Sequence, residues 1–419
     1  MTKPDCDKTV VLLRFDVDSR THLISNSPFN SNERRTVSTL ALLYSARMVG
    51  LFMVLPILVV YGQALEGATP AMLGLALGVY GLTQAILQIP MGWMSDRVGR
   101  KPVIIFGLII FALGSALAAQ ASSVTELVVG RALQGGGAIA GVIMALLADA
   151  TRPDQRTKAM AVVGISIGLS FGVALVLGPV IASAFGLQGV FNLTAAFALI
   201  GILLVVFLLP SPPKIAPDNE QHREANWYRN ADLWRLNAGV FLLHFVLTGA
   251  FLIVPLLLLD QAGMPKEAHW KVYGAVLLLS FVGLGVLMRL SEKGGRPKFA
   301  LLTALASLLV SLAVFQTDSV HSVLFIGGGL WFFFVGFNFL EATLPSLLSK
   351  RVNPHRRGAA MGSFSTSQFA GAFLGGSLGG LSLSYTSPKG LLLALAFLLL
   401  VWAAWLVTSE KLFEIERSR

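Results

Sequence analysis

Long apolar stretches recur along this 419-residue chain, and they constrain its fold more than any other feature. A helix that crosses about 30 Å of hydrocarbon needs roughly 20 mostly apolar residues. The segment GLLLALAFLLLVWAAWLV at 390–407 meets that need and is apolar on every face. Strands of a membrane β-barrel would instead alternate apolar and polar residues over roughly ten positions. The sequence therefore predicts an all-α polytopic membrane protein.

The charge content agrees with a chain whose solvent is the bilayer. Charged residues make up 13% of the chain, against about a quarter in soluble domains. The mean hydropathy is +0.72. We expect 12 transmembrane helices, near 38–62, 72–94, 102–121, 124–148, 158–184, 190–209, 236–259, 270–290, 299–317, 321–349, 358–385 and 389–407.

The position of the basic residues predicts how these helices are oriented. Of the 32 lysines and arginines, 27 fall in segments that would lie on one side of the membrane, and only Lys266, Lys271 and Lys389 on the other. Cytoplasmic loops carry such an excess, so both termini are predicted to be cytoplasmic. The net charge of +10 is then explained by membrane topology, without nucleic acid as a partner.

Two sequence repeats predict that the chain consists of two six-helix pseudo-symmetric halves. SDRVGRKP at 95–102 returns as SEKGGRPK at 291–298, and DQRTKAMA at 154–161 resembles PHRRGAAMG at 354–362. Parallel repeats of this kind are a transporter architecture. We expect a disordered cytoplasmic leader at 1–33, an N-terminal half at 34–209, a cytoplasmic linker at 210–235, a C-terminal half at 236–407 and a cytoplasmic tail at 408–419.

Glycines at every fourth position follow the second repeat in both halves. One series is Gly164, Gly168 and Gly172, and the other is Gly371, Gly375 and Gly379. Small residues at this spacing let two helix backbones approach closely. We therefore expect both series to pack against neighbouring helices.

Three motifs, in the expected order, identify a family resemblance. GWMSDRVGRKP at 92–102 resembles motif A of the major facilitator superfamily, RALQGGGA at 131–138 resembles motif B, and LGPVIAS at 177–183 resembles the Gly-Pro end of the antiporter motif C. The similarity extends over residues 34 to about 407. Within the superfamily, the segment SARMVGLFMVLP is similar to the bacterial YajR-type drug:proton antiporters. Those antiporters carry a soluble domain after the last helix, which is not expected here.

The resemblance implies a function and a location. It implies a secondary active transporter of the bacterial inner membrane that exports small lipophilic or cationic compounds in exchange for protons by alternating access. The partners would be the substrate, protons and the bilayer, and the protein would work as a monomer. The alternatives are a sugar or metabolite efflux carrier, and a non-transporting membrane receptor or scaffold.

Motif A predicts a conformational latch at the cytoplasmic face. The basic residues there could serve only as membrane anchors, but an acid among them with this glycine spacing is not explained that way. The resemblance implies a relay from Asp96 through Arg100 to Asp149, with Gly92 and Gly99 for close packing and a tight turn. The predicted latch residues are Gly92, Asp96, Arg97, Gly99, Arg100, Lys101 and Asp149. In motif C, Gly178 and Pro179 are predicted to be a conformational element.

Three ionisable residues fall inside predicted membrane helices and are candidates for proton coupling: Arg47, Arg131 and Glu341. A charge at that depth is unfavourable unless it faces the interior or reaches the interface. The alternative for Arg131 is that its side chain extends to the periplasmic surface. The alternative for Glu341 is a permanent ion pair with one of the two arginines.

Five polar residues could line a cavity or join helices by hydrogen bonds: Tyr80, Gln84, Gln88, His244 and Asn338. The first three recur every fourth residue and so share one helix face. The sequence leaves both roles open.

No enzyme motif is present. The chain has no phosphate-binding loop, no zinc-spaced Cys/His set and no nucleophile elbow, and its one cysteine is Cys6. We therefore expect neither an enzyme activity nor a cofactor or metal, and the energy source would be an ion gradient.

Overall fold

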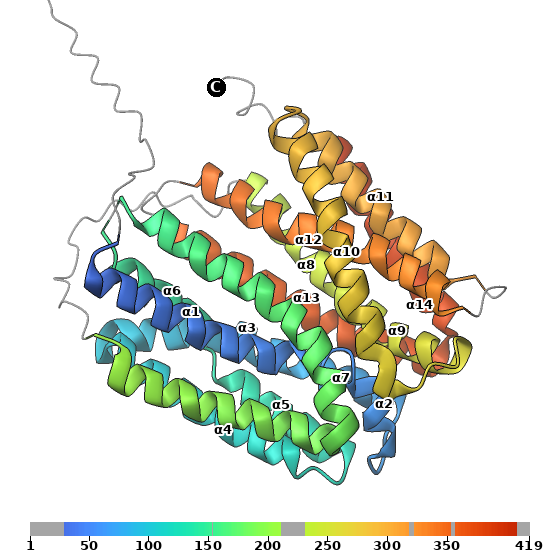
Figure 1. Ribbon diagram of the computed structural model, residues 1–419, viewed down its shortest axis with the longest axis horizontal. Helices are drawn as coiled ribbons and strands as arrows, with labels where there is room; N and C mark the ends of the chain where they lie inside the picture. Colours follow the sequence, from blue (N-terminus) through green and yellow to red (C-terminus); the bar gives the residue numbers. More distant parts are fainter. Residues whose placement is uncertain (1–28, 153, 211–230, 318–321, 353–356, 409–419) are drawn as a thin grey trace, which may run out of the picture.

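The computed structural model describes residues 29–152, 154–210, 231–317, 322–352 and 357–408, which form a bundle of long helices (Figure 1). In chain order the elements are α1 (Ser31–Phe52), α2 (Leu58–Tyr61), η1 (Gly62–Ala64), α3 (Pro70–Val98), α4 (Arg100–Ala119), α5 (Val124–Gly136), α6 (Ala140–Asp149), α7 (Arg156–Leu203), η2 (Leu204–Leu208), α8 (Ala231–Phe251), α9 (Val254–Leu256), η4 (Leu257–Gln261), η5 (Lys266–Ala268), α10 (His269–Glu292), α11 (Pro297–Phe315), α12 (Val323–Arg351), α13 (Arg357–Tyr385) and α14 (Pro388–Val407).

Within the described residues, nine segments are long and apolar enough to cross a membrane. One of them, Lys158–Leu208, bends at Gly186, where φ is +64° and the helical geometry of α7 is interrupted. Helices α1 and α13 belong to the same bundle but are not among the nine. The predicted all-α membrane fold is confirmed, and the number of crossings stays a prediction.

Side-chain caps and prolines set where the helices begin. Asn30 and Glu33 form a capping box that begins α1, and Ser123 and Glu126 form one that begins α5. Each pair satisfies two backbone amides that have no partner within the helix. Pro70 stands first in α3 after the capping Thr69, where a missing amide does no harm.

Two helices break inside the apolar region. Helix α1 ends at Phe52, shortly before Pro56, which lacks the amide that a helix needs. Helices α5 and α6 are separated at Gly137–Ile139, where the glycine run after Gln134 ends. A broken helix leaves carbonyl groups free to accept hydrogen bonds from side chains.

An acid–arginine tie recurs in both halves of the chain. At the start of α1, Glu33 accepts from Arg152 Nε at 2.9 Å, and at the start of α8, Asp232 accepts from Arg351 Nη1 at 2.5 Å. The sequence separation is 119 residues in both ties. The hydrogen bonds from Arg152 lower the pKa of the Glu33 carboxyl to about 2. Each tie fixes the first helix of its half to the segment that follows the fourth predicted membrane helix of the same half.

The two halves of the chain pack together at the end of the bundle remote from Asp96. There α3 lies against α13 so closely that a Cβ on Gly78 or Gly81 would stand 2.5 Å from a carbonyl oxygen of α13. One hydrophobic cluster joins residues of both halves, for example Phe171 of α7 with Phe334 and Phe337 of α12. A second cluster consists only of first-half residues around α1, α4 and α6.

The predicted glycine packing is correct in one helix and wrong in most of the other. In α13, a Cβ on Gly371 or Gly375 would collide with the backbone of α8 at Phe241 or Phe245. In α7, Gly164 and Gly168 have no such neighbour within 4 Å, and only Gly172 meets a side chain of another helix. The cause is that α7 contacts α10 through its later turns, beyond these two glycines.

Candidate functional site

The motif A residues come together at one end of α3. Arg100 Nε donates to Asp149 Oδ2 at 3.0 Å, and Nη1 donates to Asp96 and, at 2.6 Å, to Ser95 Oγ. The turn that makes this possible has Gly99 at φ +104°, a conformation that favours glycine. The structure thus joins Asp96, Arg100 and Asp149, all from the first half of the chain.

The remaining motif A residues have other contacts. The Arg97 guanidinium lies 3.6 Å from the ring centre of Trp93, and Lys101 Nζ donates to the Leu209 carbonyl. A Cβ on Gly92 would meet nothing within 4 Å, so the close packing predicted there is wrong in this structure. Since the described ion pairs of motif A stay within one half, they do not by themselves clamp the halves together, and the latch role stays a prediction.

Arg47 lies buried in the first half, with 2% of its surface exposed. Its Nη2 donates to Tyr80 Oη at 2.9 Å, to Gln84 Oε1 at 2.8 Å and to the Gly137 carbonyl at 3.0 Å. That carbonyl is available because the helix is broken between α5 and α6. Nε and Nη1 have no hydrogen-bond partner among the described residues.

Arg131 is also buried, but all three of its guanidinium nitrogens donate. Nε reaches the Ala76 carbonyl at 3.2 Å, Nη1 reaches Gln134 Oε1 at 2.5 Å and Nη2 reaches the Leu77 carbonyl at 3.4 Å. Gln134 in turn donates to Ser115 Oγ at 2.8 Å. With 1% exposure the side chain does not extend to a surface, so that alternative is wrong.

The polar face of α3 joins helices instead of standing free in a cavity. Tyr80 and Gln84 accept from Arg47, and Gln84 Nε2 donates to Gln88 Oε1 at 3.4 Å. The exposure of these three side chains does not exceed 5%. The Tyr80 ring also lies 6.2 Å from that of Phe369 on α13, so the first-half network reaches the second half at this point.

The second half holds a separate cluster in which Gln368 connects His244 and Glu341. His244 Nδ1 is 3.1 Å from the Val240 carbonyl, a distance at which it donates, which leaves Nε2 as an acceptor. The Gln368 amide then donates to His244 Nε2 at 2.8 Å and to Glu341 Oε1 at 3.2 Å. The cluster combines α8, α12 and α13.

Glu341 is the more exposed of the two ionisable side chains in that cluster. Its side chain is 36% exposed, while His244 is 6% exposed and stands 3.8 Å from Glu341 Oε2. That oxygen is buried and has no hydrogen-bond partner among the described residues. No ion pair joins Glu341 to Arg47 or Arg131 in the described chain, so the permanent pair considered for it does not form.

Two other candidates lie elsewhere. Asn338 donates to Ser280 Oγ of α10 at 3.1 Å and takes no part in the Glu341 cluster. Gly178 lets α7 approach the broken end of α1, because a Cβ there would stand 2.5 Å from the Met53 carbonyl. Pro179 follows inside α7. Gly178 of motif C thus packs against a helix of the first half.

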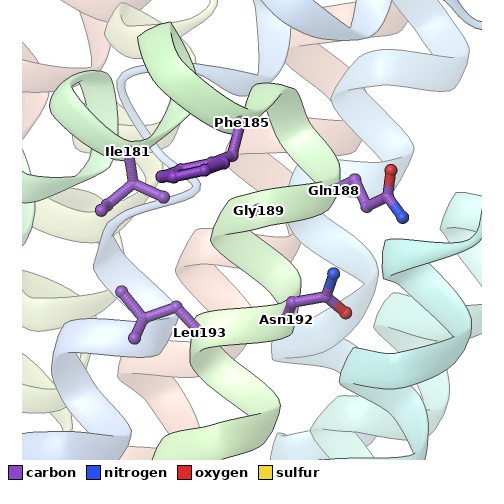
Figure 2. A pocket seen from close by; sticks show the side chains of 6 residues that line it. All are labelled: Ile181, Phe185, Gln188, Gly189, Asn192 and Leu193. Atoms are coloured by element: carbon purple, nitrogen blue, oxygen red, sulfur yellow. The ribbon is translucent and has the colours of Figure 1, made fainter.

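An open depression lies at the bend of α7, and none of the predicted site residues line it (Figure 2). Gln188 and Asn192 extend from one side of the helix there, and Ile181 and Leu193 from the other. Since the charged clusters are elsewhere, this depression is not the candidate site.

Two groups of the candidate site were not predicted from the sequence. Gln368 follows a run of serine and threonine residues in α13, and only its place opposite His244 and Glu341 reveals its role. The Gly137 carbonyl is a backbone group, for which the run of three glycines after Gln134 was the one available signal.

Comparison with known proteins gives three findings. The sequence pattern of the Major Facilitator Superfamily matches residues 40–376. The inner membrane transport protein YajR of Escherichia coli K12 is 42% identical over 377 residues, which is 88% of this chain and 82% of that protein. The multidrug resistance protein MdtH of Proteus mirabilis is 29% identical over 352 residues, 79% of this chain and 83% of that protein.

A solved structure agrees at the level of the fold. The nucleoside transporter NupG superposes with a TM-score of 0.68 over 89% of this chain and 99% of its own, at 16% identity.

Proposed function

This chain belongs to the major facilitator superfamily, and from that premise we propose that it exports small lipophilic organic molecules in exchange for protons. Relatives described as multidrug resistance proteins support export as the direction of transport. The Escherichia coli relative, described as an inner membrane protein, supports a bacterial inner membrane location. We place both termini in the cytoplasm on the distribution of basic residues and take the monomer as the working unit.

The observation that carries the proposal is the environment of Glu341. One carboxylate oxygen is held by Gln368, the other has no hydrogen-bond partner, and the side chain is 36% exposed. A carboxyl group in a membrane protein that is neither paired with a cation nor fully sealed can take up a proton on one side and release it on the other. Glu341 is therefore the proton carrier in this proposal, and His244 with Gln368 positions it.

A chain of contacts connects this proton site to the surface between the halves. Gln368 precedes Phe369, whose ring lies 6.2 Å from that of Tyr80, and Tyr80 accepts from Arg47. A change of charge at Glu341 can thus alter the contact of α13 with α3, which is where the halves meet most closely. Alternating access requires that contact to open and close.

The experiment measures proton movement with an internal pH dye in proteoliposomes that hold a proton gradient. Lipophilic compounds added to the wild type are expected to collapse the gradient, and Glu341→Gln is expected to reduce that rate at least tenfold because the amide cannot carry a proton. Glu267→Gln, the same change at an exposed position beside α10, is the matched control.

The outcomes separate cleanly. Proton movement that persists in Glu341→Gln rejects Glu341 as the carrier. Substrate-dependent transport without any proton movement in the wild type rejects antiport.

Sugar or metabolite export is the second candidate function. Gln84 and Gln88 are the side chains that would recognise hydroxyl groups, but Gln84 already accepts from Arg47 and donates to Gln88.

A further inference from the structure

Arg47 is a buried cation with two nitrogens that donate to nothing in the described chain. Its Nη2 is shared by three neutral oxygens, while Nε and Nη1 have no acceptor. We propose that Arg47 binds the negatively charged group of the transported molecule, and that the cargo is an apolar organic acid bearing one oxyanion such as a carboxylate. This inference rests on the proposed function, whose substrate class it defines.

No acid among the described residues of the first half forms an ion pair with Arg47. Glu33 lies on the same helix but 14 residues earlier, which is about 21 Å along the axis at 1.5 Å per residue, and it is bonded to Arg152. Asp96 and Asp149 are bonded to Arg100 at the far end of α3. Glu126 is exposed and caps α5.

The second buried arginine, Arg131, provides a comparison within the same protein. Arg131 has an acceptor for each of its three nitrogens, on α3 and α5. Both arginines are less than 3% exposed, so burial does not distinguish them. What distinguishes Arg47 is the set of free N–H groups, and unpaired donors on a desolvated charge favour an anionic partner.

The surroundings of Arg47 indicate an apolar body for that anion. The guanidinium lies 5.5 Å from the ring centre of Phe111, and the ring of its partner Tyr80 meets Phe111 at 6.5 Å and Phe369 at 6.2 Å. A guanidinium flanked by rings binds a carboxylate while the rings contact an apolar or aromatic skeleton.

Glu341 is the competing anion. Its Oε2 is also without a partner, so the two orphaned groups could meet in a conformation other than this one. The choice between an external acid and Glu341 can be tested by binding, because an internal partner would exclude the external one.

The test is equilibrium binding, by titration calorimetry on the purified full chain at pH 7.5 and without a proton gradient. The probes are naphthalene-2-carboxylate and naphthalene-2-carboxamide, which have the same skeleton and differ in charge. Wild type is expected to bind the carboxylate at least tenfold more tightly than the carboxamide. Arg47→Gln is expected to reduce that ratio below threefold.

A second variant keeps the test valid if Arg47→Gln does not fold. Gln84→Glu places a carboxylate where Oε1 already accepts from Arg47 at 2.8 Å, and it is also expected to reduce the ratio below threefold. The matched control is Gln120→Glu, the same change at an exposed position at the end of α4, which is expected to keep the wild-type ratio.

Three results would overturn the proposal. The first is equal wild-type affinity for the two probes, and the second is a tenfold ratio that survives in Gln84→Glu. The third is a carboxylate preference that appears only in Glu341→Gln, which would make Glu341 the partner of Arg47. A preference that is the same in wild type and Glu341→Gln supports an external anion. Since no proton moves in this assay, failure of the antiport test leaves its result standing.

Discussion

The two halves of this protein treat buried charge in opposite ways. In the first half, Arg47 and Arg131 are buried, donate hydrogen bonds to neutral oxygens and have no acidic partner among the described residues. In the second half, the acid Glu341 is half exposed and is held by an amide and a histidine. The first arrangement keeps a constant charge, because an arginine does not lose its proton at physiological pH. The second arrangement contains a carboxyl group without a cationic residue bonded to it.

The two proposals made above give the halves separate tasks that match this difference. A constant positive charge suits recognition of a ligand, whereas a titratable carboxyl group suits exchange with protons. The halves meet where Tyr80 faces Phe369, so the two tasks are adjacent without sharing a residue. Three stability measurements can break or sharpen this comparison.

The largest effect is expected from Arg131→Met. Loss of the guanidinium leaves Gln134 Oε1 without its donor in a buried site, and we expect the free energy of unfolding to fall by about 3 kcal/mol. His244→Leu in the second half, which removes two hydrogen bonds from a partly open cluster, is expected to lower it by about 1 kcal/mol.

Titration with a denaturing detergent in mixed micelles, followed by circular dichroism, measures both changes. If Arg131→Met is neutral or stabilising, the guanidinium costs more in desolvation than its bonds return, and the first half is not held together by that charge.

The contact between the halves gives the second prediction. A Cβ added by Gly78→Ala would lie 2.5 Å from the Phe373 carbonyl, and we expect a loss of about 2 kcal/mol together with separation of α3 from α13. Gly164→Ala is the control, since nothing lies within 4 Å, and a change below about 1 kcal/mol in either direction is expected.

Cross-linking of cysteines placed on α3 and α13 reports the separation. Equal cross-linking yields in Gly78→Ala and Gly164→Ala would show that the glycine is not what allows the close approach.

The smallest effect concerns the acid–arginine ties, where the halves are alike. Arg152 is 46% exposed, so we expect Glu33→Gln to lower stability by about 1 kcal/mol, and Asp232→Asn by a similar amount. The pKa of Glu33 is lowered from 4.5 to about 2. Its contribution is therefore complete above pH 4.5 and disappears as the pH falls toward 2.

Unfolding measured at pH 7 and at pH 2.5 tests the sign. A Glu33→Gln variant that loses the same stability at both values would contradict the assignment to the carboxylate.

Much of the fold follows from one-dimensional features of the sequence. Apolar segments of membrane length predict helices because the bilayer offers the backbone no other hydrogen-bond partner. Prolines and glycines mark breaks, as at Pro56 and Gly137. The packing of Gly164 and Gly168 was not predictable, because whether a glycine is covered depends on which end of the bundle is closed.

The sequence predicted which residues belong to the candidate site but not which hydrogen-bond partners they have. Charge inside an apolar helix singles out Arg47, Arg131 and Glu341, since burial of charge is unfavourable. Which acceptors each charge meets depends on helices distant in sequence, so neither Gln368 nor the free donors of Arg47 could be read from the chain. An arginine paired with Glu341 was as reasonable from sequence as what the structure shows.

The Glu33–Arg152 and Asp232–Arg351 ties have the same spacing in both halves, which bears on how the halves are related. Positions 33 and 232 are 199 residues apart, and so are positions 152 and 351, and so are the helix-capping serines at 123 and 322. If the halves arose by duplication, the block between the tied residues has kept its length in both copies through every later substitution. The spacing inside the block is not constant, because SDRVGRKP at 95–102 and SEKGGRPK at 291–298 are 196 positions apart, so changes of length inside the block have cancelled. Blocks 33–152 and 232–351 are therefore natural units for building chimaeras with related transporters, with junctions at the tied residues.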